Sequence, residues 1–144
     1  MKIFLINGPN LNFLGKRQTN IYGFNTLNDI ETLLIKKAKK FKVKLECYHS
    51  NHEGYIIDSI QRAYYNNCNS IIINAGAYSH TSISILDALN IFHGTIIEVH
   101  ISNIYNRETF RHKSYISIRA NAVISGMGVY GYISALNYLI KGIK

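Results

Sequence analysis

Five short runs rich in Ile and Val recur along the chain, and stretches with helical periodicity separate them. The runs are Lys2–Ile6, Val43–His49, Ser70–Ala75, Gly94–Ser102 and Asn121–Ser125. Most of them are almost continuously apolar, which is typical of strands covered on both faces in a parallel sheet. We therefore predict an α/β fold: a doubly wound five-stranded parallel sheet, most simply in the order 2-1-3-4-5, with helices on both faces.

The segments between these runs have the spacing of amphipathic helices. One helix is predicted from Thr26 to Phe41, with an acidic first turn and a lysine-rich last turn, as the helix dipole favours. Its apolar face is predicted to consist of Leu27, Ile30, Leu33, Leu34, Ala38 and Phe41. Further helices are expected at Tyr55–Tyr65, at Thr81–Phe92 and in Gly126–Gly142.

The composition predicts a single domain over residues 1–144, because 47% of the side chains are hydrophobic and a chain of this length can bury a substantial core. No apolar run approaches the roughly 20 residues that cross a bilayer, and no leader peptide is recognisable. We expect a soluble, cytoplasmic protein with no membrane partner. Cys47 and Cys68 lack CxxC spacing, so we expect neither a disulfide nor a zinc site.

A formal charge of +8 favours an anionic partner, which could be a nucleic acid, a membrane surface or a small acidic ligand. Many of the lysines lie on the solvent face of the first predicted helix. That position weakens the nucleic-acid interpretation, and steering of a small anionic substrate explains the charge better.

Polar residues follow the strands at the edge where a doubly wound sheet binds its ligand. Glu98 and His100 are two residues apart at a strand end, so their side chains share one face and can pair. A carboxylate that holds one imidazole nitrogen fixes the tautomer and raises the basicity of the other, as a general acid or base requires. The alternative is a hydrogen-bonded pair with no catalytic role.

Two further segments carry candidate ligand-binding residues. Asn74 ends the third strand and His80 lies near the start of the next helix, where anions are attracted; an ordinary capped helix with a surface His is the alternative. Arg107 and Arg111 have guanidinium groups that suit a carboxylate or phosphate; the alternative is that they are solvated or paired with Glu108.

The stretch "NGPNLNFLGKRQTNIYG" is an unusually long polar loop after a buried strand. Arg17 precedes Tyr22 by five residues. A nearby guanidinium favours the phenolate, so this pair could supply a base near neutral pH. A loop Tyr that only packs is the alternative.

The glycines at 126, 128 and 131 spell G-x-G-x-x-G, the pattern of a dinucleotide-binding turn. No further strand follows, and no acidic residue lies about 20 positions on to hold a ribose. We therefore interpret these glycines as a tight turn and a close helix contact, and we expect no cofactor.

Taken together, the segments resemble the type II 3-dehydroquinate dehydratases of the shikimate and quinate pathways. The matching pieces are "NGPNLNFLG" with Arg17 and the following "YG", "SNHEGYIID", "INAGAYSHTSISILDAL", "EVHISNIYNRETFRHKSYIS" and "ISGMGVYGYISAL". They cover nearly the whole chain in order. The resemblance implies a flavodoxin-like fold, homododecamers built as a tetramer of trimers, and loss of water from 3-dehydroquinate through an enolate, without metal or cofactor.

The resemblance also implies roles for individual residues. Tyr22 would remove the proton beside the ketone and Arg17 would activate it. Asn10 would help to stabilise the enolate through a water molecule. His100, oriented by Glu98, would protonate the departing hydroxyl.

Other positions match residues that hold the hydroxyls and the carboxylate of the substrate. These are Asn74, His80, Ser102 with the backbone of Ile101, and Arg111. Asp87 resembles a residue that a neighbouring subunit contributes.

The chain departs from the family pattern after Arg17, where Glu-Pro is usual and Gln18-Thr19 stands here. The loss of a carboxylate and of a fixed φ predicts a more mobile loop, and we expect this loop to close over the substrate and exclude water. The alternative to the enzyme is a flavodoxin-like nucleotide-binding or signalling module. A flavodoxin would need a Ser/Thr-rich phosphate loop after the first strand, whereas this chain has Gly8-Pro9-Asn10.

Overall fold

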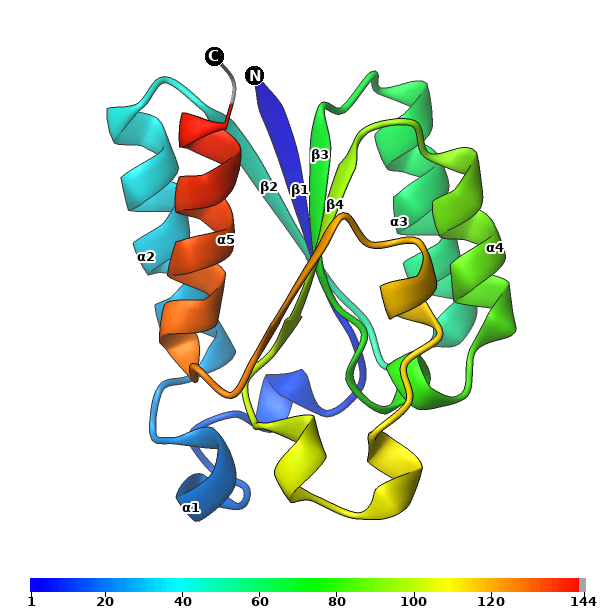
Figure 1. Ribbon diagram of the computed structural model, residues 1–144. Helices are drawn as coiled ribbons and strands as arrows, with labels where there is room; N and C mark the ends of the chain where they lie inside the picture. The colour runs from blue at the N-terminus through cyan, green and yellow to red at the C-terminus, as the bar shows by residue number, and fades with distance from the viewer. Residues whose placement is uncertain (143–144) are drawn as a thin grey trace.

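The computed structural model describes residues 1–142, and its centre is a five-stranded parallel sheet (Figure 1). The strands are β1 (Lys2–Asn7), β2 (Lys44–His49), β3 (Ser70–Asn74), β4 (Thr95–His100) and β5 (Ala122–Ser125). Their order is β2-β1-β3-β4-β5, and every pairing is parallel. The predicted fold class and strand order are confirmed.

Helices cover both faces of the sheet, as predicted. Figure 1 shows α2 (Leu27–Lys40) and α5 (Val129–Lys141) on one side, and α3 (Glu53–Tyr65) and α4 (Ile83–Ile91) on the other. The connections contain the short helix α1 (Thr19–Tyr22) and five 3₁₀ turns. These are η1 (Leu11–Phe13), η2 (Gly76–His80), η3 (Ile104–Asn106), η4 (Thr109–Arg111) and η5 (Ile116–Ile118).

Successive side chains of β1 enter two separate cores. Ile3 and Leu5 pack beneath α2 and α5, whereas Phe4 and Ile6 pack beneath α3 and α4. Because side chains alternate across a strand, covering both faces requires an apolar residue at every position. This explains the continuous runs in the sequence.

The amino end of α2 forms a capping box. The Thr26 hydroxyl accepts from the Asp29 amide at 3.1 Å, and the Thr26 amide donates to the Asp29 carboxylate at 2.9 Å. The predicted apolar face was wrong at two positions, because Leu33 is 44% and Phe41 53% exposed. Leu33 lies at the edge of the buried stripe, and Phe41 follows the last helical residue, so the helical period no longer places it.

The glycines at 126, 128 and 131 make a turn before α5 and a packing contact within it, as predicted. Gly126 and Gly128 have φ values of 85° and 57°, which favour glycine. A Cβ on Gly131 would lie 3.3 Å from side-chain atoms of Ile124 and Val99, so this glycine lets α5 approach the sheet closely.

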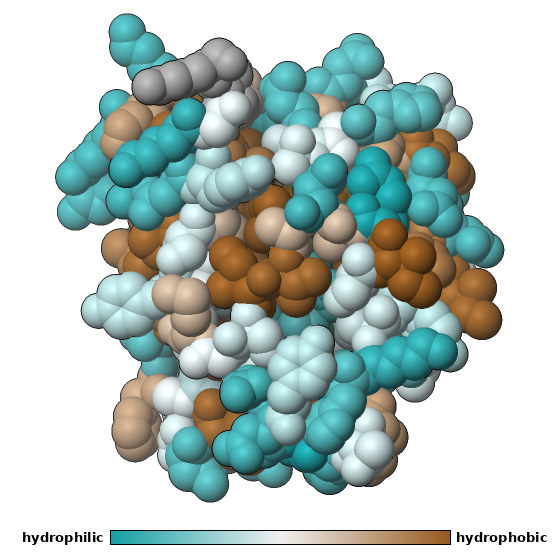
Figure 2. Space-filling view, viewed as in Figure 1, coloured by the Kyte–Doolittle hydropathy of each residue, from teal (hydrophilic) through white to brown (hydrophobic). Residues whose placement is uncertain are grey.

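Hydrophobic side chains gather on the face that Figure 2 shows, across the middle of the molecule in front of the sheet edge. The edge is β5, which pairs only with β4. Val123 of β5 and Ile118 of η5 are 43% and 69% exposed.

Among the helices of residues 1–142, none is long and apolar enough to span a membrane.

Candidate active site

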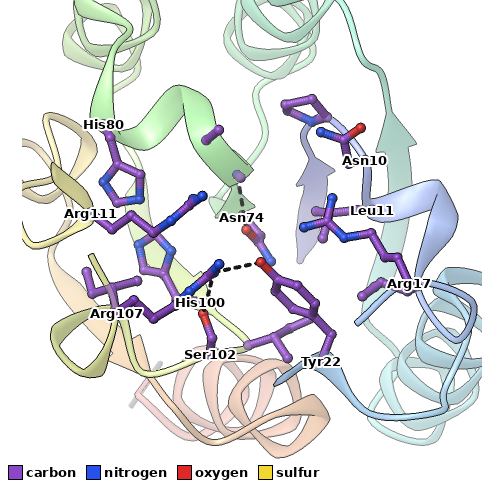
Figure 3. Close-up of a pocket in the computed structure, with 16 residues that line it drawn as sticks. Asn10, Leu11, Arg17, Tyr22, Asn74, His80, His100, Ser102, Arg107 and Arg111 are labelled. Atoms are coloured by element: carbon purple, nitrogen blue, oxygen red, sulfur yellow. Dashed lines mark hydrogen bonds between the residues drawn. The ribbon is translucent and has the colours of Figure 1, made fainter. Parts of the chain in front are cut away.

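A cavity of about 200 Å³ opens at the carboxyl edge of the sheet, where the segments after β1, β3 and β4 meet (Figure 3). This is the place that the doubly wound fold predicts. Most of the predicted site residues line it: Asn10, Arg17, Tyr22, Asn74, His80, His100, Ile101, Ser102 and Arg111. In Figure 3, Asn10, Arg17 and Tyr22 face His80, His100 and Arg111 across the cavity.

Glu98 and His100 form the pair predicted from their spacing on β4. The Nε2–H of His100 donates to Glu98 Oε1 at 2.6 Å. Glu98 is fully buried behind His100, which is 5% exposed and lines the cavity. This bond fixes the tautomer of the imidazole and leaves Nδ1 for a group in the cavity.

Two serines complete the surroundings of the Glu98 carboxylate. The Ser114 hydroxyl donates to Oε1 at 2.5 Å, and the Ser117 hydroxyl donates to Oε2. Burial by itself would raise the pKa of Glu98, but the hydrogen bonds from His100, Ser114 and Ser117 outweigh it and lower the pKa. The sequence analysis assigned no role to either serine, although both lie in the segment from Glu98 to Ser117 that matches the family.

His80 lies beside His100 with its ring nearly parallel, at a centroid distance of 6.0 Å. Its Nδ1–H donates to the Lys113 carbonyl at 2.8 Å, which leaves Nε2 for the cavity. Burial lowers the pKa of His80, and the charges of His100 and Arg111 lower it further. The ring therefore favours its neutral form.

Tyr22 lies between two arginines. The guanidinium carbon of Arg17 is 4.7 Å from the centroid of the Tyr22 ring. The hydroxyl itself accepts a hydrogen bond of 2.7 Å from Arg107, which also lies 3.4 Å from the Ser102 hydroxyl. The sequence suggested Arg107 only as part of a fork with Arg111, and its contact with a residue 85 positions away was missed.

Glu108 holds the two arginines of this segment from the outside. Its carboxylate accepts from Arg111 Nε at 2.8 Å and lies 3.7 Å from Arg107 Nε. Both arginines also line the cavity, so pairing with Glu108 and facing a ligand are compatible. Glu108 is half-exposed and screened by solvent, so it leaves the cavity strongly positive.

Asn74 belongs to a buried chain of hydrogen bonds that the sequence did not reveal. Its Nδ2–H donates to the Tyr132 hydroxyl at 2.8 Å, and that hydroxyl donates to Asn7 Oδ1 at 2.8 Å. The Gly76 amide donates to Asn74 Oδ1 at 3.2 Å. A Cβ on Gly76 would lie 3.1 Å from the Pro9 carbonyl oxygen, so this glycine lets the segments after β1 and β3 approach closely.

The opening loop contains two short helices, η1 and α1, and its predicted mobility stays a prediction. Asn10 and Gln18 have φ values of 67° and 37°, and each precedes a short helix. The backbone N–H of Asn10 donates to the side-chain oxygen of Asn51 at 2.9 Å, which connects the loop to the segment after β2. These contacts bring Arg17 and Tyr22 over the strand ends.

Asp87 is the predicted site residue that lies away from the cavity, on the exposed side of α4. Its assignment to a neighbouring subunit stays a prediction. Within residues 1–142, no cluster of three or more His, Cys, Asp or Glu side chains could hold a metal ion.

The arrangement combines three features on one small cavity. Arg17, Arg107 and Arg111 supply positive charge for a small carboxylate. A phenol with a cationic donor lies on one side, and an imidazole held by a buried carboxylate lies on the other. Such a pair can remove one proton from a substrate and deliver another elsewhere on it.

Comparisons with known proteins agree with this chemistry. Residues 1–140 match the family model described as dehydroquinase class II. A 3-dehydroquinate dehydratase of Bartonella henselae is 52% identical over 141 residues, which cover 98% of this chain and 95% of that protein. A catabolic 3-dehydroquinase of Debaryomyces hansenii is 50% identical over 140 residues, or 97% of each chain.

A solved structure is similar over almost the whole chain. The crystal structure of a type II dehydroquinase from Butyrivibrio crossotus matches with a TM-score of 0.94 and 50% identity. The match covers 96% of this chain and 97% of that one. The family model, the relatives and the shared fold together show that this chain belongs to the class II dehydroquinase family.

Proposed function

We propose that the protein eliminates water from 3-dehydroquinate to give 3-dehydroshikimate in the shikimate pathway. The observation that carries this proposal is the cavity in which Tyr22 and the Glu98–His100 pair face each other between arginines. About half of the residues of this chain are identical to those of a protein named 3-dehydroquinate dehydratase and of one named catabolic 3-dehydroquinase. The family match favours this hydro-lyase over a flavodoxin-like nucleotide-binding or signalling module.

Tyr22 is the base in this proposal, and it removes the proton beside the ketone. The hydrogen bond from Arg107 and the nearby guanidinium of Arg17 support the role, since positive charge stabilises a phenolate oxygen. Asn10 lies on the same side of the cavity, where an amide donor can stabilise the enolate through water.

His100 is the acid, and it protonates the hydroxyl that leaves. Glu98 holds Nε2–H, so Nδ1 is the nitrogen that faces the substrate. A buried carboxylate stabilises the protonated ring, which is the form that can deliver a proton. The neutral ring of His80 lies beside it and offers Nε2 to a substrate hydroxyl.

The carboxylate of 3-dehydroquinate binds in the arginine-rich part of the cavity. Arg111, the Ser102 hydroxyl and the backbone of Ile101 are the proposed contacts, and Asn74 holds a hydroxyl or carboxylate oxygen. A bidentate guanidinium fixes both the position and the orientation of a carboxylate.

Assembly and location are also proposals. We expect a homododecamer built from trimers, in which Asp87 of one subunit approaches the cavity of another. The exposed apolar side chains around β5 support burial of that face in an assembly. Cys47 and Cys68 are free thiols, which suits the reducing cytoplasm. Analytical ultracentrifugation would test the assembly directly.

The reaction is tested by following the ultraviolet absorbance of the conjugated product formed from 3-dehydroquinate, with EDTA present throughout. Turnover by the wild-type protein is expected, together with its loss in Tyr22→Phe and His100→Ala. Thr109→Ala, in the exposed segment before Arg111, is the control and keeps normal turnover. Folded wild-type protein without turnover would refute the proposed function, and full activity in Tyr22→Phe would refute the role of that residue.

A further inference from the structure

Tyr132 is the largest fully buried side chain of the described structure, yet its polar end lies beside the active-site cavity. The ring packs in the core beneath α5. Its hydroxyl joins two asparagines at the carboxyl ends of neighbouring strands, Asn7 of β1 and Asn74 of β3, each at 2.8 Å. These two asparagines are directly opposite each other in the parallel pairing.

The directions of these hydrogen bonds follow from one fixed donor. The Gly76 backbone N–H points at Asn74, so the atom that receives it must be the side-chain oxygen. The Asn74 nitrogen then faces the Tyr132 hydroxyl and donates to it. The phenol has one proton of its own, and it gives that proton to Asn7 Oδ1.

The phenol stays protonated at any working pH, which keeps the chain of bonds in one direction. Burial raises the pKa of Tyr132, and the hydrogen bond from Asn74 offsets only part of that rise. Asn74 is 3% exposed and lines the cavity. With its oxygen bound to Gly76 and one N–H bound to Tyr132, its remaining N–H is free for a ligand.

We propose that Tyr132 is a positioning residue whose buried hydroxyl holds the Asn74 carboxamide so that an N–H, and not the oxygen, faces the bound ligand. At this point Asn74 can only donate a hydrogen bond. The ligand group that it binds must therefore have an oxygen lone pair, as a carboxylate has, or a hydroxyl that donates its own proton elsewhere. The inference rests on the proposed function, since it assigns Asn74 a contact with 3-dehydroquinate.

The test is a double-mutant cycle on the turnover of 3-dehydroquinate, with Tyr132→Phe, Asn74→Ala and the double variant. Tyr132→Phe keeps the ring and removes the hydroxyl. We expect the KM to rise about tenfold, because that factor corresponds to the free energy that one ordinary hydrogen bond contributes. We expect kcat to stay within about twofold of wild type. We expect the double variant to match Asn74→Ala, because the hydroxyl acts only through that amide. Tyr138→Phe is the matched control, since Tyr138 lies on the same helix and is 58% exposed.

A merely structural role gives a different result. Loss of folded protein would lower the apparent kcat and leave the KM unchanged, and independent action would give additive effects in the double variant. Either result overturns the proposal. If Tyr132→Phe does not fold, Asn7→Ala removes the acceptor of the phenol from outside the cavity and is expected to raise the KM about threefold. An unchanged KM in that variant would overturn the proposal too.

A second measurement separates this inference from the proposed function. Wild-type protein that does not convert 3-dehydroquinate would end the proposed function by itself. The side-chain amide of Asn74 can still be followed by ¹⁵N NMR, with its signals assigned by their loss in Asn74→Ala. Slow hydrogen exchange in the wild type and fast exchange in Tyr132→Phe are expected, and equal exchange rates would refute the fixed carboxamide.

Discussion

Replacing Glu98 by Gln separates the charge of the buried carboxylate from its shape. Glu98 is fully buried and accepts hydrogen bonds from His100, Ser114 and Ser117. In Glu98→Gln the amide oxygen can keep the bonds from His100 and Ser114. The amide nitrogen then faces Ser117, whose hydroxyl can rotate and accept.

The expected loss follows from the change of one charged bond into a neutral one. Hydrogen bonds to charged groups contribute about 1.5–3 kcal/mol and neutral ones about 0.5–1.5 kcal/mol. The imidazolium of His100 therefore loses about 1–2 kcal/mol of stabilisation, which lowers kcat roughly 5- to 30-fold. Because every polar partner stays satisfied, we expect the free energy of unfolding to change by less than about 1 kcal/mol.

The assay compares kcat and KM for 3-dehydroquinate with urea unfolding of the same protein samples. The control is Glu46→Gln, the same substitution on β2, where the carboxylate contacts Lys2, Lys44 and Tyr48 away from the cavity. A kcat of Glu98→Gln within twofold of wild type would refute the idea that the charge of Glu98 supports the acid. An equal loss in the control would refute it as well.

Three further predictions concern other parts of the structure. Arg107→Lys keeps the charge but loses the short guanidinium bond to Tyr22, so we expect kcat to fall about tenfold in the same assay; unchanged kcat would contradict this. Glu46 has its pKa lowered to about 2 by Tyr48 and lysine contacts, so its stabilisation is full above pH 4.5 and is lost as the pH falls toward 2. Urea unfolding should therefore show Glu46→Gln to be less stable than wild type by about 1 kcal/mol at pH 7, allowing for solvent screening, and the gap should narrow by pH 3. Gly54→Ala fills open space in α3 and should stabilise the protein by about 0.5–1 kcal/mol. Gly8→Ala would collide with the backbone oxygen of Ala75, just after β3, and should destabilise the protein by more than about 2 kcal/mol. Equal thermal stability of the two variants would contradict the difference in packing at these two glycines.

The features predicted well from the sequence depend on short-range geometry. The alternation of strands and helices gave the sheet, and the two-residue period placed Glu98 beside His100. The rule that parallel strand ends meet at one edge brought Asn74, His80 and Tyr22 to one cavity.

The features that were missed join residues far apart in the chain. Arg107 reaches Tyr22 across 85 positions, and Tyr132 reaches Asn7 across 125. Neither contact leaves a local pattern, and Tyr132 looks like an ordinary core residue of an amphipathic helix. The positions of Leu33 and Phe41 show the same limit, because helical phase alone does not say where a buried stripe ends.

The strand order also determines when this protein can acquire activity during its synthesis. The first strand made, β1, lies between β2 and β3, so its second edge stays unpaired until residues 70–74 have emerged from the ribosome. Arg107 and Arg111 are made about forty residues after β3 begins, and Tyr132 later still. A nascent chain that ends before β4 already contains Arg17 and the strands that pair with β1, but it lacks His100, Arg107 and Arg111. We therefore expect that a polypeptide stalled in this interval can begin to form the sheet but has no activity, because His100, Arg107 and Arg111 have not yet been made.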